Sequence, residues 1–182
     1  SSELHILNWS FGGCPKIFGI QSTSLLDQKC IEHLNSLSLL QKTINAHVPI
    51  LFIERISSYI EGFNEAELIE QSISPNRFYI ERLYTSRTEE YYQEFTQSMV
   101  DTYCALAEYR RVYILRPIPE LKVDVPRTMG RAALFNLEKR VSISMEEYEE
   151  RHRIAWAAQD RAAEQCNVTL LDPRPYLCRE GR

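Results

Sequence analysis

The sequence has no apolar run long enough to cross a bilayer. Its longest runs, such as residues 48–53 and 112–115, are far shorter than the roughly 20 residues that a transmembrane helix needs. No signal-peptide pattern opens the chain, and it has no internal repeat or low-complexity segment. With 182 residues and 44% hydrophobic residues, we expect residues 1–182 to form a single domain around one core.

The sequence also lacks a continuous basic surface. Its formal net charge is −4, and Lys and Arg are scattered among Asp and Glu rather than grouped along one segment. Binding to a phosphate backbone depends on clustered positive charge. We therefore predict no nucleic-acid partner.

What the sequence contains is an alternation of short apolar runs and longer helical patterns. Near-continuous apolar runs predict buried strands at residues 4–7, 49–53, 111–115 and 168–171. Helical spacing predicts helices over residues 25–46, over 89–108 and from Ser144 onward, where Ser144 and Glu147 form a capping box. Residues 57–87 are expected to be irregular, apart from a short helix near 65–71. This order predicts an α/β fold, a three-layer α/β/α sandwich with a parallel sheet.

In such a sheet the functional groups lie beyond the carboxyl ends of the strands. This directs attention to residues 8–16, 54–59, 116–120 and 172–178. The segment after the third run is rich in proline: Pro117 and Pro119 favour an extended exit, and Pro126 suits the first turn of a helix with Asp124 as N-cap. We interpret these prolines as stiffening a strand-to-helix connection, without direct chemistry of their own.

Four stretches together carry a resemblance to a known family: "GGCPKIFG" from Gly12, "RPIPELKVDVPRTMGRA" from Arg116, "SISMEEYEERH" from Ser142 and "LLDPRPYLC" from Leu170. They resemble the SGNH-hydrolase-like domain fused to the C-terminus of membrane-bound acyltransferase family three proteins, which O-acetylate bacterial surface glycans such as lipopolysaccharide O-antigen. The resemblance implies an SGNH-hydrolase (flavodoxin-like) fold and a periplasmic domain of an inner-membrane protein. It also implies an acyl donor delivered by a transmembrane acyltransferase domain, a glycan acceptor and no cofactor.

The resemblance does not extend to the family's catalytic blocks. Family members carry Gly-Asp-Ser-His before the equivalent of residues 4–10 and Asp-x-x-His after the equivalent of Cys178, and neither Gly-Asp-Ser nor Asp-x-x-His occurs here. We therefore expect a fragment that lacks the first strand and the C-terminal end, with no catalytic residue in this chain and no activity alone. The rival hypotheses are a carbohydrate esterase and a non-catalytic glycan-binding module.

The resemblance nevertheless implies residues that bind oxyanion or substrate. Gly12 and Gly13 match the block that offers a backbone amide to the oxyanion, with Gly13 the preferred donor, although both glycines also suit a simple turn. In "FIERISSY", similar to the family's Ala-Arg-Trp-Ser-x-Tyr, Arg55 is predicted to hold an acyl oxygen or sugar hydroxyl and Tyr59 to stack on a sugar. Ile56 replaces the usual Trp, and a structural ion pair is an equal alternative for Arg55.

The five cysteines carry information about the cellular compartment. The family places a disulfide between positions matching Cys14 and Cys30, which implies an oxidising compartment, here the periplasm. Cys178 is expected to pair beyond this chain. Cys104 and Cys166 are expected to be buried thiols, with a second bridge as the alternative, and a cytoplasmic protein with five free thiols is the competing interpretation.

Glu149 and His152 are spaced i, i+3, as in some helical metal sites. No second copy of the motif supplies partner ligands, so we interpret the pair as part of a solvated helix face and predict no metal site. Trp9 and Phe11, near the glycines, are expected to pack in the core rather than line a pocket.

Overall fold

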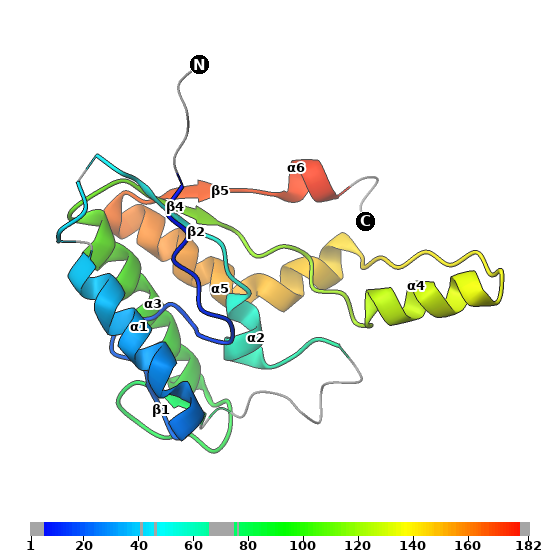
Figure 1. Cartoon of the computed structure of the whole chain (residues 1–182), viewed down its shortest axis with the longest axis horizontal. Helices are drawn as coiled ribbons and strands as arrows, with labels where there is room; N and C mark the ends of the chain where they lie inside the picture. The colour runs from blue at the N-terminus through cyan, green and yellow to red at the C-terminus, as the bar shows by residue number, and fades with distance from the viewer. Residues whose placement is uncertain (1–5, 41, 46, 66–74, 76, 179–182) are drawn as a thin grey trace.

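The computed structural model describes residues 6–40, 42–45, 47–65, 75 and 77–178 (Figure 1). No helix among these residues has the length and apolar character needed to span a membrane. The elements follow one another as β1 (Gln21–Ser22), η1 (Leu25–Asp27), α1 (Gln28–Leu40), β2 (Ile50–Phe52), α2 (Ile56–Glu61), β3 (Phe78–Tyr79), α3 (Glu89–Ala107), β4 (Val112–Leu115), α4 (Val125–Leu134), α5 (Met145–Cys166), β5 (Thr169–Leu171) and α6 (Arg174–Leu177).

A parallel sheet in the order β2-β4-β5 forms the centre of the fold. Ile50 lies opposite Val112, and Tyr113 lies opposite Thr169. These strands confirm the apolar runs predicted at 49–53, 111–115 and 168–171. With helices flanking this sheet, the predicted α/β class is confirmed.

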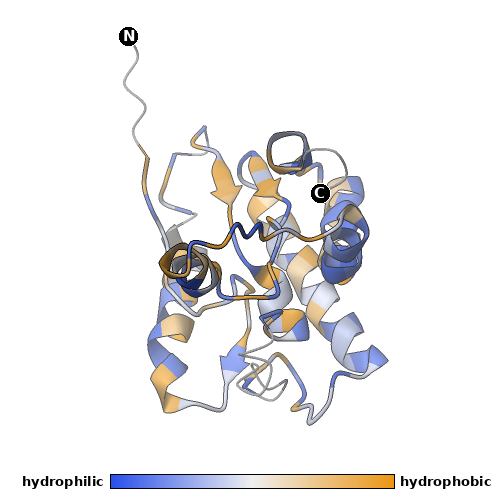
Figure 2. Cartoon of the chain, turned by 90° about the vertical axis from the view of Figure 1, so that its right-hand side faces the viewer, coloured by the Kyte–Doolittle hydropathy of each residue, from blue (hydrophilic) through white to orange (hydrophobic). Residues whose placement is uncertain are grey.

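The two faces of the sheet are buried to different extents. Phe52, Val112 and Ile114 point into the core that α3 and α5 share with the sheet. Leu51 and Ile53, which alternate with Phe52 along the chain, are exposed. Among the described residues, the long helices thus lie against one face of an apolar sheet, as Figures 1 and 2 show.

The helices α3 and α5 pack along each other and form the main support of the sheet. The predicted apolar faces are confirmed, because Phe95, Met99 and Tyr103 of α3 are buried, as are the predicted alanines of α5, Ala155, Ala158 and Ala162. Small side chains at Ala155 and Ala158 allow the close approach of the two helices. The buried residues of α5 are Tyr148, His152, Ala155, Ala158, Gln159 and Ala162.

The predicted capping box begins α5. The Glu147 amide donates to Ser144 Oγ at 3.1 Å, and the Ser144 amide donates to Glu147 Oε2 at 2.9 Å. Replacing Ser144 with Ala is therefore expected to lower the free energy of unfolding by about 1 kcal/mol, measured by urea denaturation. Ser142→Ala, at an exposed position just before the cap, serves as the control and should change it by less than about 0.5 kcal/mol. Equal effects of the two substitutions would contradict a capping role for Ser144.

The proline-rich connection after β4 also has its predicted form. Pro126 lies in the first turn of α4, and Asp124 is the N-cap, whose side chain accepts from the Arg127 amide at 2.9 Å.

Two predictions near the N-terminus are wrong. The helix expected over residues 25–46 ends at Leu40, and its first turn is the 3₁₀ segment η1, where Leu25 and Leu26 are exposed. Of the strand expected at 4–7, residues 6 and 7 lie in no strand and are exposed, and residues 4 and 5 are outside the described residues. Among the described residues, neither Ile6 nor Leu7 pairs with a strand.

The segment 57–87 is more regular than predicted, because it includes most of α2 as well as β3. Ile56 and Ile60 lie one turn apart on α2 and are fully buried. β3 pairs with β1 as an antiparallel ribbon, and Arg77 beside it forms an ion pair with Asp27 of η1 at 2.8 Å. Most of the short helix predicted near 65–71 falls outside the described residues.

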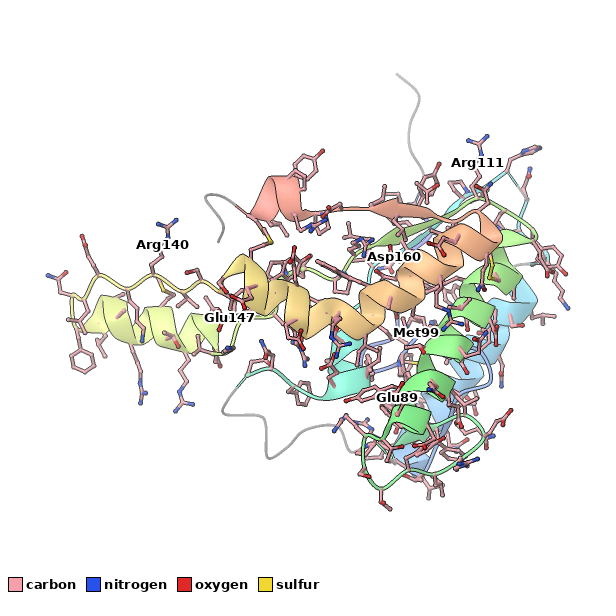
Figure 3. The ribbon with its side chains drawn as sticks, turned by 180° about the vertical axis from the view of Figure 1, so that it is seen from behind. Glu89, Met99, Arg111, Arg140, Glu147 and Asp160 are labelled. Carbon is pink, nitrogen blue, oxygen red and sulfur yellow. A yellow bond between two sulfur atoms is a disulfide. The ribbon has the colours of Figure 1, made fainter. Side chains whose placement is uncertain are left out.

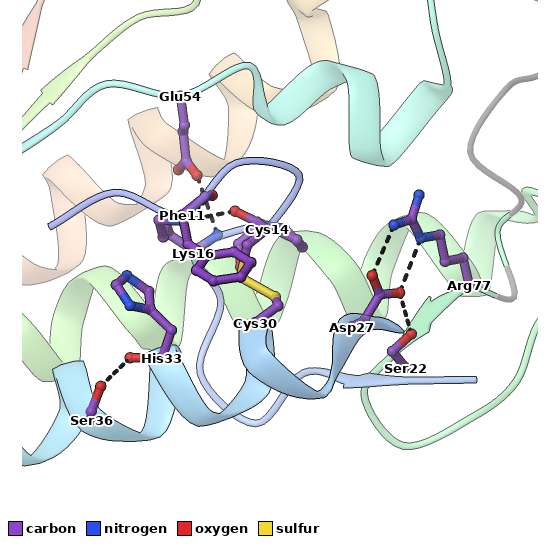
Figure 4. Close-up of a disulfide and its surroundings, with 11 residues drawn as sticks. Phe11, Cys14, Lys16, Ser22, Asp27, Cys30, His33, Ser36, Glu54 and Arg77 are labelled. Carbon is purple, nitrogen blue, oxygen red and sulfur yellow. Dashed lines mark hydrogen bonds and ion pairs between the residues drawn. A yellow bond between two sulfur atoms is a disulfide. The ribbon is translucent and has the colours of Figure 1, made fainter. Parts of the chain in front are cut away.

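The structure contains two disulfides. Cys14 and Cys30 are bridged, as the family resemblance implied (Figure 4). Cys104 and Cys166 are also bridged, with Cα atoms 5.1 Å apart, so the prediction of two buried thiols is wrong. The reason is that α3 and α5 pack side by side and then lead into the neighbouring strands β4 and β5, which brings their C-terminal turns together. Cys178 is a free thiol in this chain.

Candidate functional site

The carboxyl ends of β2, β4 and β5 meet at one edge of the sheet because the three strands are parallel. A groove of about 430 Å³ lies at this edge, between the segments that follow β2 and β4. Its lining consists of Arg55, Glu65 and residues 118–121 and 123–126. The predicted functional edge therefore contains a real concavity, with one guanidinium and the three carboxylates of Glu65, Glu120 and Asp124 among its residues.

Arg55 lies between β2 and α2, and its side chain lines this groove. Its Nη2 lies 3.1 Å from Oε1 of Glu65, and its Nε lies 3.2 Å from Oε1 of Glu120. The ion pair considered as an alternative for Arg55 is thus present. Because 49% of the side chain remains exposed, the guanidinium is also within reach of a ligand in the groove, and its role toward substrate stays a prediction.

Glu120 joins three segments beneath the groove, and the sequence analysis did not find it. Its side chain is almost completely buried and accepts from Arg151 Nε at 2.8 Å as well as from Arg55. Its backbone carbonyl accepts from the side-chain Nδ2 of Asn64 at 2.5 Å, and Arg151 also donates to the carbonyl of Gly62 at 2.6 Å. A buried carboxylate needs such partners, so this network fixes the floor of the groove.

The Gly12–Gly13 turn is exposed, and Gly13 has a φ of +75°, a conformation that favours glycine. Lys16 Nζ donates to the carbonyls of Phe11 at 3.2 Å and Cys14 at 3.0 Å, one on each side of the glycines (Figure 4). The Cys14–Cys30 bridge ties the end of this turn to α1. The turn therefore has a fixed shape and an accessible backbone, while its role toward an oxyanion stays a prediction.

Glu54 connects the glycine turn to the sheet edge. Its Oε2 accepts from the Lys16 amide at 3.4 Å, and its Oε1 accepts from the hydroxyl of buried Tyr103 at 3.0 Å. Burial raises the pKa of Glu54 above its ordinary value and lowers the pKa of Lys16. The positive charge of Lys16 partly offsets the shift of Glu54, and the negative charge of Glu54 partly offsets the shift of Lys16. The sequence offered one signal for Glu54, which occupies the alanine position of the Ala-Arg-Trp-Ser-x-Tyr pattern.

Tyr59 does not line the groove around Arg55. Its ring packs edge-on against Phe78, with centroids 5.8 Å apart, and burial raises the pKa of its hydroxyl to about 12. Lys16 and Glu54 thus link the glycine turn to the residue that precedes Arg55, although neither glycine lines the groove. Tyr59 lies with the aromatic side chains of the core. Sugar stacking by Tyr59 stays a prediction.

Aromatic side chains also surround the glycine turn. His33 of α1 stacks on Trp9 with ring centroids 5.0 Å apart, and Phe11 lies 5.5 Å from the same ring. Phe11 is 36% exposed. The expectation that Phe11 packs in the core is therefore wrong, and the aromatic group forms one wall of the turn.

His152 and Ser57 form a buried pair between α5 and α2. Nδ1 of His152 lies 2.7 Å from Ser57 Oγ, and the imidazole is completely buried beside Tyr148. The prediction of a solvated helix face is therefore wrong for His152, while Glu149 does lie at the surface, 3.1 Å from Arg174. In the part of the chain that the structure describes, no group of side chains could hold a metal ion.

A parallel sheet flanked by helices, with a groove and an arginine at its carboxyl edge, defines a domain of the α/β class. The family model described as "SGNH domain (fused to AT3 domains)" matches residues 2–182. The chain belongs to this family, whose description as fused to AT3 domains gives it a membrane-protein context. No curated protein and no solved structure gives a significant match.

Proposed function

We propose that this chain is the periplasmic SGNH domain of a membrane O-acyltransferase that transfers acetyl or other acyl groups to hydroxyls of cell-surface polysaccharide. The observation that carries the proposal is the exposed Gly12–Gly13 turn beside Glu54 and Arg55, in a family fused to acyltransferase domains. An open backbone turn next to a cationic side chain suits an acyl group whose carbonyl oxygen becomes negative during transfer.

The proposed reaction has two steps. A serine from outside these 182 residues attacks the acyl donor delivered by the transmembrane domain. Histidine of an Asp-x-x-His block takes the serine proton and passes it to the carrier group of the donor, which leaves. The sugar hydroxyl then attacks the acyl-serine and loses its proton to the same histidine, which passes the proton to the departing serine oxygen, so that the free serine and the acylated glycan are released. The Gly13 amide stabilises the oxyanion in both steps, with Gly12 shaping the turn. Arg55 holds the acyl oxygen or a sugar hydroxyl, and Tyr59 contacts the sugar.

The open edge of β2 supports this completion of the site. The flavodoxin-like fold has five parallel strands in the spatial order 2-1-3-4-5, counted along the chain. We assign β2, β4 and β5 of this structure to the third, fourth and fifth strands of that order. The first strand of the fold would then pair with β2. β2 pairs only with β4 among the described residues, and Leu51 and Ile53 are exposed there. A strand at this position ends next to the glycine turn, where the nucleophile is required.

The two disulfides support the proposed location. Bridges between Cys14 and Cys30 and between Cys104 and Cys166 persist in oxidising compartments and are rare in the cytosol. A domain fused to a membrane acyltransferase and cross-linked in this way fits the periplasmic side of an inner membrane.

The test is the substitution Gly13→Ala in the complete protein, assayed for acyl transfer to its glycan. A side chain at φ +75° displaces the turn and its amide, so we expect kcat to fall at least about tenfold, because losing one oxyanion donor costs 10²–10³-fold in comparable sites. Gly19→Ala is a matched control, since Gly19 has a φ of +77° and an added Cβ meets no atom within 4 Å at either glycine.

Equal activity of Gly13→Ala and Gly19→Ala would contradict the oxyanion role. If water rather than the glycan accepted the acyl group in the complete protein, the domain would be a carbohydrate esterase. Saccharide binding without turnover, unchanged by removal of the external serine, would instead identify a glycan-binding module.

A further inference from the structure

The segment from Leu121 to Ile143, called here the α4 arm, projects from the rest of the molecule (Figures 1 and 3). It leaves the edge of the sheet after Glu120, forms α4 and returns to the start of α5. Within the arm only Ala132 and Ile143 are buried. Its ten-residue helix is about 15 Å long, which separates its far end from the body of the domain.

The far end of the arm has a fixed shape. The Leu137 amide donates to the Ala132 carbonyl at 2.8 Å, the Asn136 amide donates to the Ala133 carbonyl at 3.1 Å, and Asn136 has a φ of +52°. This is the hydrogen-bond pattern of a Schellman motif, which closes a helix C-terminus firmly. The side chains at this end are therefore held in place on a short, well-capped helix.

Three large apolar side chains are presented at this end. Leu134, Phe135 and Leu137 are 78%, 68% and 64% exposed, and we call these three residues the arm tip. A Schellman motif often buries the residue that Leu137 represents against the helix, yet here it faces outward. Clustered apolar side chains at a projecting position mark an interaction surface.

Basic residues flank the arm tip in the sequence, with one acidic residue, Glu138, among them. Arg131, Lys139 and Arg140 have no ion-pair partner among the described residues, and Arg140 points outward in Figure 3. The arm as a whole has five basic and two acidic side chains, whereas the complete chain has a net charge of −4. The arm is thus the basic, apolar extremity of an otherwise acidic domain.

We propose that the arm tip inserts into the interfacial region of an anionic phospholipid membrane, with Arg131, Lys139 and Arg140 contacting lipid phosphates. A bilayer surface presents negative charge directly above hydrocarbon, which matches apolar side chains flanked by cations that form no ion pair with the described residues. The family's fusion to AT3 domains gives the chain a membrane-protein context. This inference goes beyond acyl transfer and does not depend on it.

The test uses the 182-residue chain with two kinds of vesicle, pure phosphatidylcholine and an equimolar mixture of phosphatidylcholine and phosphatidylglycerol, in a flotation assay. We expect binding to the mixed vesicles that weakens with salt. Leu134→Ser with Phe135→Ser should weaken this binding at least about tenfold, as should Lys139→Glu with Arg140→Glu. The matched controls are Leu83→Ser, exposed elsewhere on the surface, and Arg111→Glu, which lies at the other end of the molecule in Figure 3.

The insertion of the arm tip into the bilayer is measured separately with the variant Phe135→Trp. The emission of the variant minus that of the parent, which contains Trp9 and Trp156, should shift to shorter wavelength when the mixed vesicles are added. No binding to the mixed vesicles, or binding that both arm variants retain, would overturn the proposal. So would binding without a fluorescence shift, since the arm tip would then not insert. Arm-dependent association with the protein's own transmembrane part in nanodiscs of neutral lipid, without vesicle binding, would assign the arm to a protein contact instead.

Discussion

Replacing both Cys104 and Cys166 with alanine is expected to lower the free energy of unfolding by about 4 kcal/mol. The bridge closes a loop of 62 residues, and on the loop-entropy account longer loops confine the unfolded chain more strongly. It also joins the C-terminal turns of α3 and α5, the two helices that support the sheet. Urea unfolding under non-reducing conditions measures this effect.

Two further variants make that result specific. Removing the Cys14–Cys30 bridge, which closes a separation of only 16 residues, should cost about 3 kcal/mol. Cys178→Ala should change stability by less than about 0.5 kcal/mol, because Cys178 is a free thiol. If the Cys104/Cys166 variant unfolded at the same urea concentration as the parent, or if thiol labelling counted three free cysteines, the second bridge would not exist in the protein.

The parallel sheet was predictable because its strands are short, nearly continuous apolar runs such as residues 111–115, a pattern with few alternative structures. The capping box at Ser144 was predictable because it needs only two residues at a fixed spacing. The two-residue strands β1 and β3 lack such a signal, since only their pairing with each other defines them. The spacing of Ile56 and Ile60 is typical of a helix, but these residues follow β2 so closely that the pattern does not separate α2 from the strand.

The location of the candidate site in the fold was predictable from the sequence, but the contacts between its side chains were not. The end of β2 located Arg55, because functional groups lie beyond the carboxyl ends of parallel strands. The Gly12–Gly13 turn was located through the family resemblance, since the described residues before it form no strand. The partners of Arg55 lie 10 and 65 residues away, so their ion pairs depend on the tertiary structure. The Cys104–Cys166 disulfide was likewise not predictable, because the two cysteines are 62 residues apart and only the packing of α3 on α5 brings them together.

His152 is the second site where a large effect is expected, and its effect depends on pH. The imidazole is completely buried beside Ser57. Burial, aided by the positive charges of Arg151 and Arg55 and opposed by the backbone at Ile118, lowers its pKa to about 4. The unfolded chain has an ordinary histidine pKa of about 6.5.

The sign of the effect follows from these two values. Above about pH 6.5, His152 is neutral in both states and the full stability is present. As the pH falls from about 6.5 to 4, the unfolded state binds a proton that the folded state does not, so the free energy of unfolding decreases by roughly 2–3 kcal/mol. Below about pH 4 both states are protonated and this contribution stops changing.

The substitution His152→Gln isolates this contribution from the carboxylates that also titrate in acid. It should lower stability at pH 7.5 by roughly 1–3 kcal/mol, because Ser57 loses its buried partner. The loss of stability between pH 6.5 and 4 should then be smaller than in the parent by the amount that His152 contributes. His47→Gln, at an exposed position, should leave that loss unchanged.

An unchanged pH dependence in the His152 variant would mean that the buried imidazole is protonated as readily in the folded state as in the unfolded chain. The Ser57–His152 pair would then join α2 to α5 as a charged contact rather than a neutral one.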